Sequence, residues 1–422
     1  MIDPEQHGAR SRTIAGIPAS VVIVAAAVAA TLLGDSMLYA VMPSRPDAWS
    51  LSVPAVGVLL SANRLVRLLT NPLAAWVFDR LGPRTPFAFA LLLAAVVTLI
   101  YGWATAFVVL LIARMVWGLC WSLLRLGGFW AVLNAATDDD RGLLMGGYSA
   151  IVRMGSVGGA LAGALLTDAI GHRSTLTIFS ALMTLAGVSW FFATRGGARD
   201  ARRSVEGDSG ARAGMVTVLA DRRLLATGLG GLITGLVFSG LVTASLGFFL
   251  REHFGEDIAM LGFAVAVTSA TGTLLGLQWS LGLPLAPLLG HLSDRFGRGV
   301  VTGAGFALGA GGLLLLAVTQ LPASLLLGIA LTFVAATALT VGLSATAGDL
   351  APPERRSAVM SSYATFLDLG SALGPLIGLG FASLATLRGM YAAAAVVLLI
   401  AAVLSQRAFA GAVRQRAEGV SR

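Results

Sequence analysis

Two residues of opposite charge lie at the same depth in separate apolar segments of the sequence. Asp35 lies seven residues before the end of the first segment (18–42), and Arg114 lies seven residues after the start of the fourth (107–132). At 1.5 Å per helical residue, both are expected about 10 Å below one surface. A buried carboxyl can take up and release a proton, whereas an arginine keeps its charge. We therefore predict an ion pair in which Asp35 carries a proton and Arg114 tunes it; the alternative is a static structural pair.

Five other charged residues also interrupt apolar segments. They are Arg64, Arg67, Arg125, Arg153 and Asp368. An ionisable side chain inside a bilayer costs roughly 2.5–3.5 kcal/mol on insertion scales, and such residues are usually functional. With Arg114 included, arginines outnumber aspartates five to two. This surplus favours an anionic or carboxylate-bearing ligand held by guanidinium groups.

Polar side chains also gather in stripes along two of these segments. In the second segment Asn63, Arg64, Arg67 and Asn71 share a narrow helical face, which is too polar to contact lipid. Arg114 and Arg125 share a face of the fourth. The predicted substrate-binding residues are Tyr39, Asn63, Arg64, Arg67, Arg125, Arg153, Gln278 and Asp368.

The composition indicates that lipid is the solvent for most of the chain. Of the 422 residues 56% are hydrophobic and only 12% are charged, whereas about 25% are charged in a soluble protein. Segments of about 20 apolar residues predict transmembrane helices. We predict twelve: 18–42, 53–78, 86–104, 107–132, 143–166, 175–194, 224–250, 259–289, 300–318, 324–347, 358–382 and 390–409.

The arginines predict the orientation, because cytoplasmic loops carry most basic residues. The loops predicted to be outside hold only Arg45, Arg173, Arg251 and Arg388, and most other arginines fall in the inner loops and tails. Both termini are therefore predicted to be cytoplasmic, in a multi-pass protein of the cell (inner or plasma) membrane. The arginines do not cluster as a nucleic-acid-binding face would require.

An internal duplication divides the chain into two halves. Adding 215 to the residue number carries Asp79-Arg80-x-Gly82 onto Asp294-Arg295-x-Gly297, and Tyr148 onto Tyr363. Internal repeats of this kind are typical of transporters. The predicted parts are an N-terminal tail (1–17), a six-helix bundle (18–195), a flexible or surface-lying cytoplasmic linker (196–223), a second six-helix bundle (224–409) and a C-terminal tail (410–422).

Two six-helix halves with such turns after helices two and eight resemble the major facilitator superfamily. Three segments also resemble its twelve-helix drug:proton antiporter branch: Leu33-Gly34-x5-Ala40-Val41-x-Pro43, Leu110-x3-Arg114-x3-Gly118 and Gly155-x3-Gly159-Ala160-x2-Gly163. The first and third lack a proline of the branch pattern, at Ala40 and Ala160. Gly370-x3-Gly374-Pro375-x2-Gly378 supplies the full third pattern in helix eleven.

The resemblance implies roles for the duplicated turn. In the family this turn is a cytoplasmic latch that stabilises the outward-facing state, and here it comprises Asp79, Arg80, Gly290, Asp294, Arg295, Gly297 and Arg298. Asp294 is expected to cap a neighbouring helix, and Arg295 and Arg298 to reach carboxylates or carbonyls. The alternative is a basic loop that only sets topology.

The resemblance also implies which helices meet between the halves. Helix eleven packs on helix two in the family, so Asp368 is expected near Arg64 or Arg67, as a gate. The equivalent Arg153 is expected to face Gln278 on helix eight. Arg153 either contacts substrate or has a hydrogen-bonded structural role.

The sequence thus predicts an all-α transporter with twelve transmembrane helices that exports a small anionic or amphipathic molecule by proton antiport. An importer or exchanger of organic or phosphorylated anions, and a membrane sensor without transport, are the alternatives. We expect no enzymatic activity, because no nucleophile–His–acid set, metal-ligand spacing or phosphate-binding loop is apparent. The proton gradient would serve in place of a cofactor, and the partners are the substrate and the bilayer, with the chain a monomer.

Overall fold

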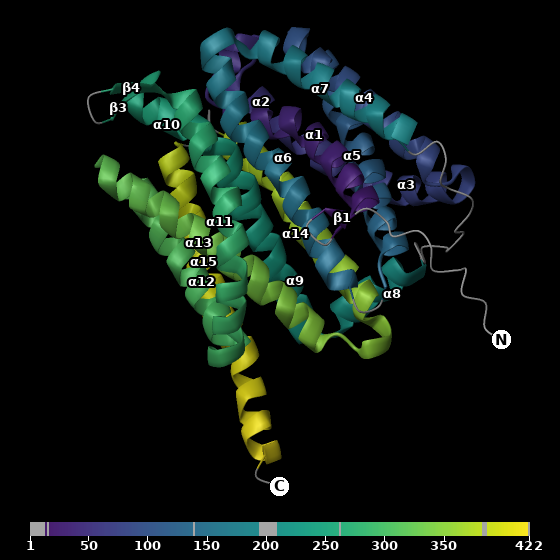
Figure 1. Cartoon of the computed structure of the whole chain (residues 1–422). Helices are drawn as coiled ribbons and strands as arrows, with labels where there is room; N and C mark the ends of the chain where they lie inside the picture. The colour runs from purple at the N-terminus through teal and green to yellow at the C-terminus, as the bar shows by residue number, and fades with distance from the viewer. Residues whose placement is uncertain are drawn as a thin grey trace, which may run out of the picture.

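The computed structural model describes residues 13–14, 17–137, 140–193, 209–260, 263–381 and 386–420, and this part of the chain is almost entirely helical (Figure 1). The first half contains β1 (Thr13–Ile14), β2 (Ile17–Pro18), α1 (Ala19–Val41), η2 (Pro46–Trp49), α2 (Val53–Leu65), α3 (Arg67–Leu81), α4 (Arg84–Trp103), α5 (Phe107–Ala135), α6 (Arg141–Ile170) and α7 (His172–Ala193). The second half contains α8 (Ser209–Ala220), α9 (Arg222–Thr234), the π-helix η3 (Gly235–Val242), α10 (Thr243–Phe254), β3 (Asp257–Met260), β4 (Phe263–Ala266), α11 (Val267–Phe296), α12 (Arg298–Val318), α13 (Pro322–Leu350), η4 (Pro353–Arg355), α14 (Arg356–Gly380) and α15 (Leu387–Val420).

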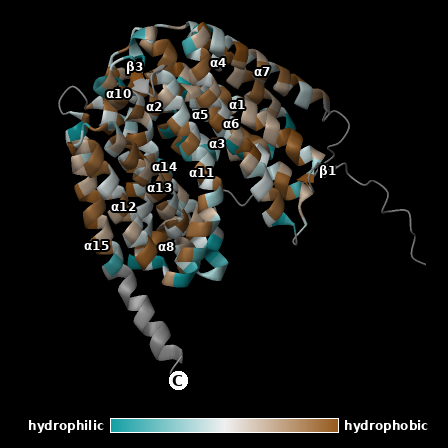
Figure 2. Ribbon diagram, turned by 60° about the vertical axis from the view of Figure 1, so that its left-hand side comes forward, coloured by the Kyte–Doolittle hydropathy of each residue, from teal (hydrophilic) through white to brown (hydrophobic). Residues whose placement is uncertain are grey.

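Eleven helical segments of the described chain are long and apolar enough to cross a membrane; α2 with α3, and α9 through α10, each form one such segment. The remaining predicted span, 358–382, corresponds to α14, which lies between the halves beside α2 and η3. Figure 2 shows apolar residues along the helices and hydrophilic residues toward their ends. The fold is that of an all-α multi-pass membrane protein.

The packing repeats between the halves as the duplication predicts. In the first half α1 packs on α6, and α4 packs on α5 and α7. In the second half α14 packs on α9 and η3, and α12 packs on α13 and α15. The halves meet where α14 contacts α2 and α11 contacts α6, which confirms the predicted contacts of helix eleven with helix two and helix five with helix eight.

Small residues set the closest of these approaches. A Cβ added at Gly155 of α6 would collide with the backbone of Ala29 on α1. The corresponding Gly370 of α14 meets the backbone of Leu232 on α9 in the same way. The glycine pattern of helices five and eleven therefore allows each half to close around its own first helix.

Three segments differ from the predicted boundaries. Helix eight was expected to begin at 259, but residues 257–260 and 263–266 form the antiparallel pair β3–β4 and α11 begins at Val267. The linker prediction covers 196–223; residues 194–208 lie outside the described chain, and α8 fills much of the remainder and packs on α14. The last helix continues to Val420, beyond the predicted end at 409.

The contacts between the halves concentrate at one end of the molecule. At this end, which we call the Ser44 end, Ser44 Oγ lies 3.4 Å from Thr268 Oγ1, and Gly247 of α10 packs on Ala40 and Ser44. Gly272 of α11 similarly packs against Ala160 of α6. The opposite end carries the Asp294 turn and the exposed lower part of α11. The halves are therefore joined at the Ser44 end, the end predicted to face outward.

Candidate functional site

Asp35 and Arg114 form the ion pair that their depths predict. Arg114 Nη1 of α5 lies 2.6 Å from Asp35 Oδ1 of α1, and the two side chains are 1% and 14% exposed. Arg114 Nε also donates to Leu59 O of α2 at 3.1 Å, and Asn63 Nδ2 donates to Asp35 Oδ1 at 3.2 Å. Three helices of one half therefore hold the carboxylate, and burial makes each of these polar contacts costly to lose.

Tyr39 connects this pair to the arginine stripe of α2. Its ring lies 5.1 Å from the guanidinium carbon of Arg64 and 5.7 Å from that of Arg114. Its hydroxyl donates to Leu60 O at 3.3 Å. Cations are attracted to the face of an aromatic ring, so Tyr39 separates and partly screens two like charges.

Arg64 reaches across to the second half through backbone carbonyls. Its Nη1 donates to Ser239 O of η3 at 2.9 Å and to Ser371 O of α14 at 3.0 Å. Pro375, four residues after Ser371, has no N–H with which to satisfy that carbonyl in the helix. Pro375 is visible in the sequence, but this consequence was not predicted, because the acceptor is a backbone atom.

Asp368 has a different partner from the one predicted. It was expected near Arg64 or Arg67; its ion pair is with Arg125, whose Nη1 lies 3.6 Å from Asp368 Oδ2, and it also lies near enough to Arg67 to attract its charge. Arg125 comes from α5, so the pair still joins the two halves. With side chains 34% and 31% exposed, this pair is looser and wetter than Asp35–Arg114. Asp368 pairs with Arg125 because the long Arg125 side chain reaches α14 from α5, while Arg64 is held by backbone carbonyls.

Arg67 has no carboxylate partner among the described residues. Its Nε is buried and has no hydrogen-bond partner in this part of the chain. One turn further along α3, Thr70 and Asn71 both contact Ser122 of α5, with oxygen–oxygen distances of 2.9 and 2.8 Å. A half-buried guanidinium with an unused donor is suited to an incoming anion.

Arg153 faces α11, although not at the predicted residue. Its Nη1 lies 3.0 Å from the place where a Cβ on Gly282 would be, so the absence of a side chain at Gly282 makes room for it. Gln278 lies one turn away, and its Oε1 is buried without a hydrogen-bond partner among the described residues. The structure therefore places the predicted pair on adjoining turns, and Gln278 Oε1 does not accept a hydrogen bond from Arg153.

The second copy of the duplicated turn is tied to its own half. Arg298 Nη1 lies 2.7 Å from Asp294 Oδ1, and Arg298 Nε lies 3.0 Å from Asp349 Oδ2 at the end of α13. Asp294 thus pairs within the turn instead of capping a neighbouring helix, and Arg295 lies over Phe296. Gly297 has a φ of 93°, and its counterpart Gly82 has a φ of 71°, a region that favours glycine.

The first copy lacks these ion pairs. Pro83 and Asn134 stand 215 residues before Arg298 and Asp349, and Arg80 lies over the ring of Trp76. Asp79 and Gly290 lie on the corresponding helices α3 and α11, and Gly290 is close to Val341. Asp349 was not among the predicted residues, although the offset of 215 could have drawn attention to it.

We expect Arg298→Ala to alter the transport cycle more than stability. Its partners Asp294 and Asp349 are 63% and 57% exposed, and exposed ion pairs contribute about 0–1 kcal/mol. Thermal unfolding of the purified variant should stay close to that of the wild type, while initial transport rates should fall severalfold. Arg141→Ala, an inner-loop arginine outside the turn, is the control; equal rates for both variants would contradict a latch role.

The charged side chains between the halves, which we call the charged layer, have a surplus of cations. The layer comprises Asp35 and Asp368 against Arg64, Arg67, Arg114 and Arg125. Among the described residues of this layer, Asp35 and Asp368 are the carboxylates, and each already pairs with an arginine. Neither Arg64 nor Arg67 forms an ion pair with a carboxylate of this set, although Asp368 lies near enough to Arg67 to attract its charge. The fold and this layer define a multi-pass membrane protein with two repeated halves and a mostly basic set of partly buried charges between them.

Comparison with known proteins identifies the family. The sequence profile of the Major Facilitator Superfamily matches residues 24–282 and 269–419, so the chain belongs to this family. An uncharacterized MFS-type transporter of Burkholderia pseudomallei is 27% identical over 348 residues, which cover 79% of this chain and 78% of the relative. The human synaptic vesicular amine transporter is 24% identical over 254 residues, which cover 58% of this chain but only 44% of that protein.

Solved structures share the fold. A bacterial homologue of the human lysosomal transporter Spinster, in an inward-facing and unoccupied conformation, superimposes with a TM-score of 0.73 at 17% identity, covering 93% of this chain and 97% of its own. A mutant of the nucleoside transporter NupG superimposes with a TM-score of 0.76 at 14% identity, covering 91% and 98%. At these identities the comparison bears on the fold alone.

Proposed function

We propose that this chain is a proton-coupled secondary active transporter that exports a small anionic or amphipathic molecule by alternating access. The observation that carries the proposal is the buried Asp35–Arg114 pair, at 2.6 Å. Protonation of Asp35 removes the charge that Arg114 balances, so binding and release of one proton changes the electrostatics of the whole layer.

The surroundings of Asp35 suit both protonation states. When the carboxylate is charged, it accepts from Arg114 and from Asn63 Nδ2. The Asn63 Oδ1 atom is buried without a partner among the described residues. A flip of the Asn63 amide would offer that oxygen to the O–H of a protonated Asp35. Leu59 O continues to hold Arg114 in either state.

Two arginines without an ion-pair partner, Arg64 and Arg67, support an anionic substrate. Arg67 has an unused buried donor, and Arg64 needs only to leave two neutral carbonyls to meet an anion. An organic cation, which the name of the vesicular amine transporters suggests for those relatives, would need a carboxylate, and in the described layer both are already paired. Export is supported by the resemblance of three segments to the drug:proton antiporter branch.

We expect Arg67→Gln to weaken transport of an anionic solute. A lost charge-assisted hydrogen bond costs about 1.5–3 kcal/mol, so KM should rise roughly 10- to 100-fold while the protein remains folded. Arg173→Gln is the control, because Arg173 lies over Trp103 at the Ser44 end, away from this layer. The change in KM would be measured from the uptake of organic acids, amines and neutral analogues into proteoliposomes. Preferential transport of amines would contradict an anionic substrate class.

The direction of transport has its own test. For an exporter in the plasma (inner) membrane, with both termini cytoplasmic, deletion of the gene should raise the intracellular level of the solute or the sensitivity to a toxic one. An importer or exchanger of organic or phosphorylated anions, the alternative favoured by the surplus arginines, predicts failure to grow on a nutrient instead.

A further inference from the structure

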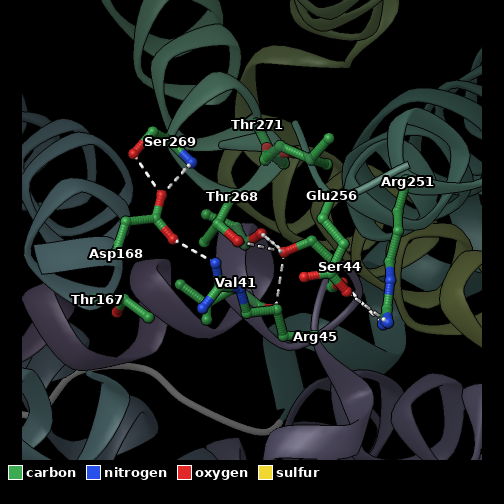
Figure 3. A network of polar contacts seen from close by, with 12 residues as sticks. Val41, Ser44, Arg45, Thr167, Asp168, Arg251, Glu256, Thr268, Ser269 and Thr271 are labelled. Atoms are coloured by element: carbon green, nitrogen blue, oxygen red, sulfur yellow. Dashed lines mark hydrogen bonds and ion pairs between the residues drawn. The ribbon is translucent and has the colours of Figure 1, made fainter. Parts of the chain in front are cut away.

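A half-buried carboxylate joins the two halves at the Ser44 end (Figure 3). Asp168 lies in the last turn of α6, and Ser269 lies in the first turn of α11 in the other half. Asp168 Oδ2 accepts a hydrogen bond from Ser269 N at 3.0 Å and another from Ser269 Oγ. Asp168 Oδ1 lies 2.9 Å from Arg45 Nη2, and the Asp168 side chain is only 16% exposed. Both carboxylate oxygens are thus engaged, one by each half.

Asp168 takes the place of a missing helix cap. The first N–H groups of a helix have no helical acceptor and are usually bound by the side chain of the N-cap residue. The N-cap of α11 is Ala266, which cannot provide one. Ser269 is the third residue of α11, and its N–H is bound by Asp168 instead. A negative charge is also favourable at this end of a helix.

The corresponding helix of the first half needs no such help. The N-cap of α2 is Ser52, whose side chain accepts a hydrogen bond from Ala55 N at 3.4 Å. This bond lies within one half and does not depend on how the halves are arranged. By contrast, the N-terminus of α11 is capped by a side chain of the other half, Asp168.

An ion pair between the halves at this end is more exposed. Arg251 Nη1 lies 2.8 Å from Asp47 Oδ2 across the interface, but the Asp47 side chain is 75% exposed. Exposed ion pairs contribute little. The Asp168 contact is the more buried of these two charged contacts, so it should contribute more than the Arg251–Asp47 pair to the preference for closure. The buried contact between Ser44 and Thr268, at 3.4 Å, involves no charge.

We propose that Asp168 is a gating residue that caps α11 from the opposite half and thereby favours closure of the Ser44 end. When the halves separate there, Ser269 moves away and α11 loses its cap. Arg45 belongs to the same half as Asp168 and keeps the carboxylate paired in both arrangements. The proposal rests on the alternating access proposed above, but on neither the substrate nor the coupling ion.

Two substitutions test the idea from opposite directions. Asp168→Ala removes the cap from the closed arrangement. Ala266→Ser gives α11 a cap of its own in both arrangements and deletes no contact. Each should raise the ratio of open to closed molecules about fivefold, the ratio that corresponds to one N-cap. The double variant should show the same fivefold change and not the product, because the introduced hydroxyl caps α11 in both arrangements.

The ratio can be measured without any substrate. Spin labels at Ser174 and Ala323, exposed residues at the starts of α7 and α13, report the separation of the halves by pulsed electron paramagnetic resonance in nanodiscs. Cys120→Ser provides the background, since Cys120 is the one cysteine of the chain. Asp47→Asn is the control and should change the ratio less than twofold. An unchanged ratio in Ala266→Ser, or multiplied effects in the double variant, would overturn the proposal; absence of solute transport would instead count against the proposed function.

Discussion

Replacing Asp35 with asparagine should abolish transport driven by a proton gradient while leaving the protein folded. Asparagine keeps the shape and one acceptor oxygen, so Arg114 Nη1 and Asn63 Nδ2 retain a hydrogen-bonding partner. It cannot bind or release a proton in the physiological range. Accumulation against a gradient should fall to the level of empty liposomes, whereas exchange of solute at equal pH on both sides should continue.

The matched control for this variant is Asp47→Asn. Asp47 lies in the same half but is 75% exposed and pairs at the Ser44 end, so its neutralisation should leave gradient-driven accumulation near the wild-type level. Full gradient-driven activity in Asp35→Asn would remove Asp35 from the coupling mechanism and leave the static ion pair as its explanation.

Arg114→Leu should destabilise the protein more than any other single substitution considered above. It leaves the Asp35 carboxylate without its ion-pair partner and Leu59 O without its side-chain donor, at a site where Arg114 is 1% exposed. Removing one partner of a buried ion pair costs about 3–5 kcal/mol. Thermal unfolding in detergent, monitored as the loss of monodisperse protein, should have a much lower midpoint temperature than in the wild type.

A double variant distinguishes the free-energy cost of an unpaired buried charge from the cost of lost packing. Asp35→Leu combined with Arg114→Leu removes both charges, and an apolar pair of similar volume is often tolerated in place of a buried ion pair. The double variant should therefore unfold at a higher temperature than Arg114→Leu alone, although it should not transport with a proton gradient. If the double variant is the less stable of the two, the pair is not the energetic unit that the geometry indicates.

The sequence predicted contacts correctly where depth in the membrane or the internal repeat determines which elements meet. Asp35 and Arg114 could be paired because each position along a helix fixes a depth in the membrane. The contact of α14 with α2 followed from the family resemblance, and the offset of 215 carried over to the packing of each half.

Side-chain partners between helices could not be predicted with the same accuracy. Depth placed Asp368 near the middle of its helix, but the choice among Arg64, Arg67 and Arg125 depends on helix rotation and on the reach of a long side chain. Arg64 is occupied by a carbonyl that Pro375 leaves free, and a pattern of side chains does not reveal backbone acceptors.

Segment ends were also difficult to predict. Residues 257–266 contain enough apolar side chains to extend the predicted helix eight, yet 257–260 and 263–266 pair as β3 and β4. Asp168 lies just beyond the predicted end of helix five at 166, where a carboxylate in a loop is unremarkable. Its importance depends on the arrival of α11 from the other half, a tertiary contact that no local pattern contains.

The most direct test of proton coupling is a solute screen in proteoliposomes with and without a proton gradient. A panel of organic acids, phosphorylated compounds, amines and neutral amphipathic molecules would be offered to the wild type and to Asp35→Asn, with the internal contents measured by mass spectrometry. We predict that at least one anionic or amphipathic solute accumulates in wild-type vesicles only when the gradient is present, and in Asp35→Asn vesicles not at all. Accumulation that is independent of the gradient, and equal in the two proteins, would contradict proton coupling through Asp35.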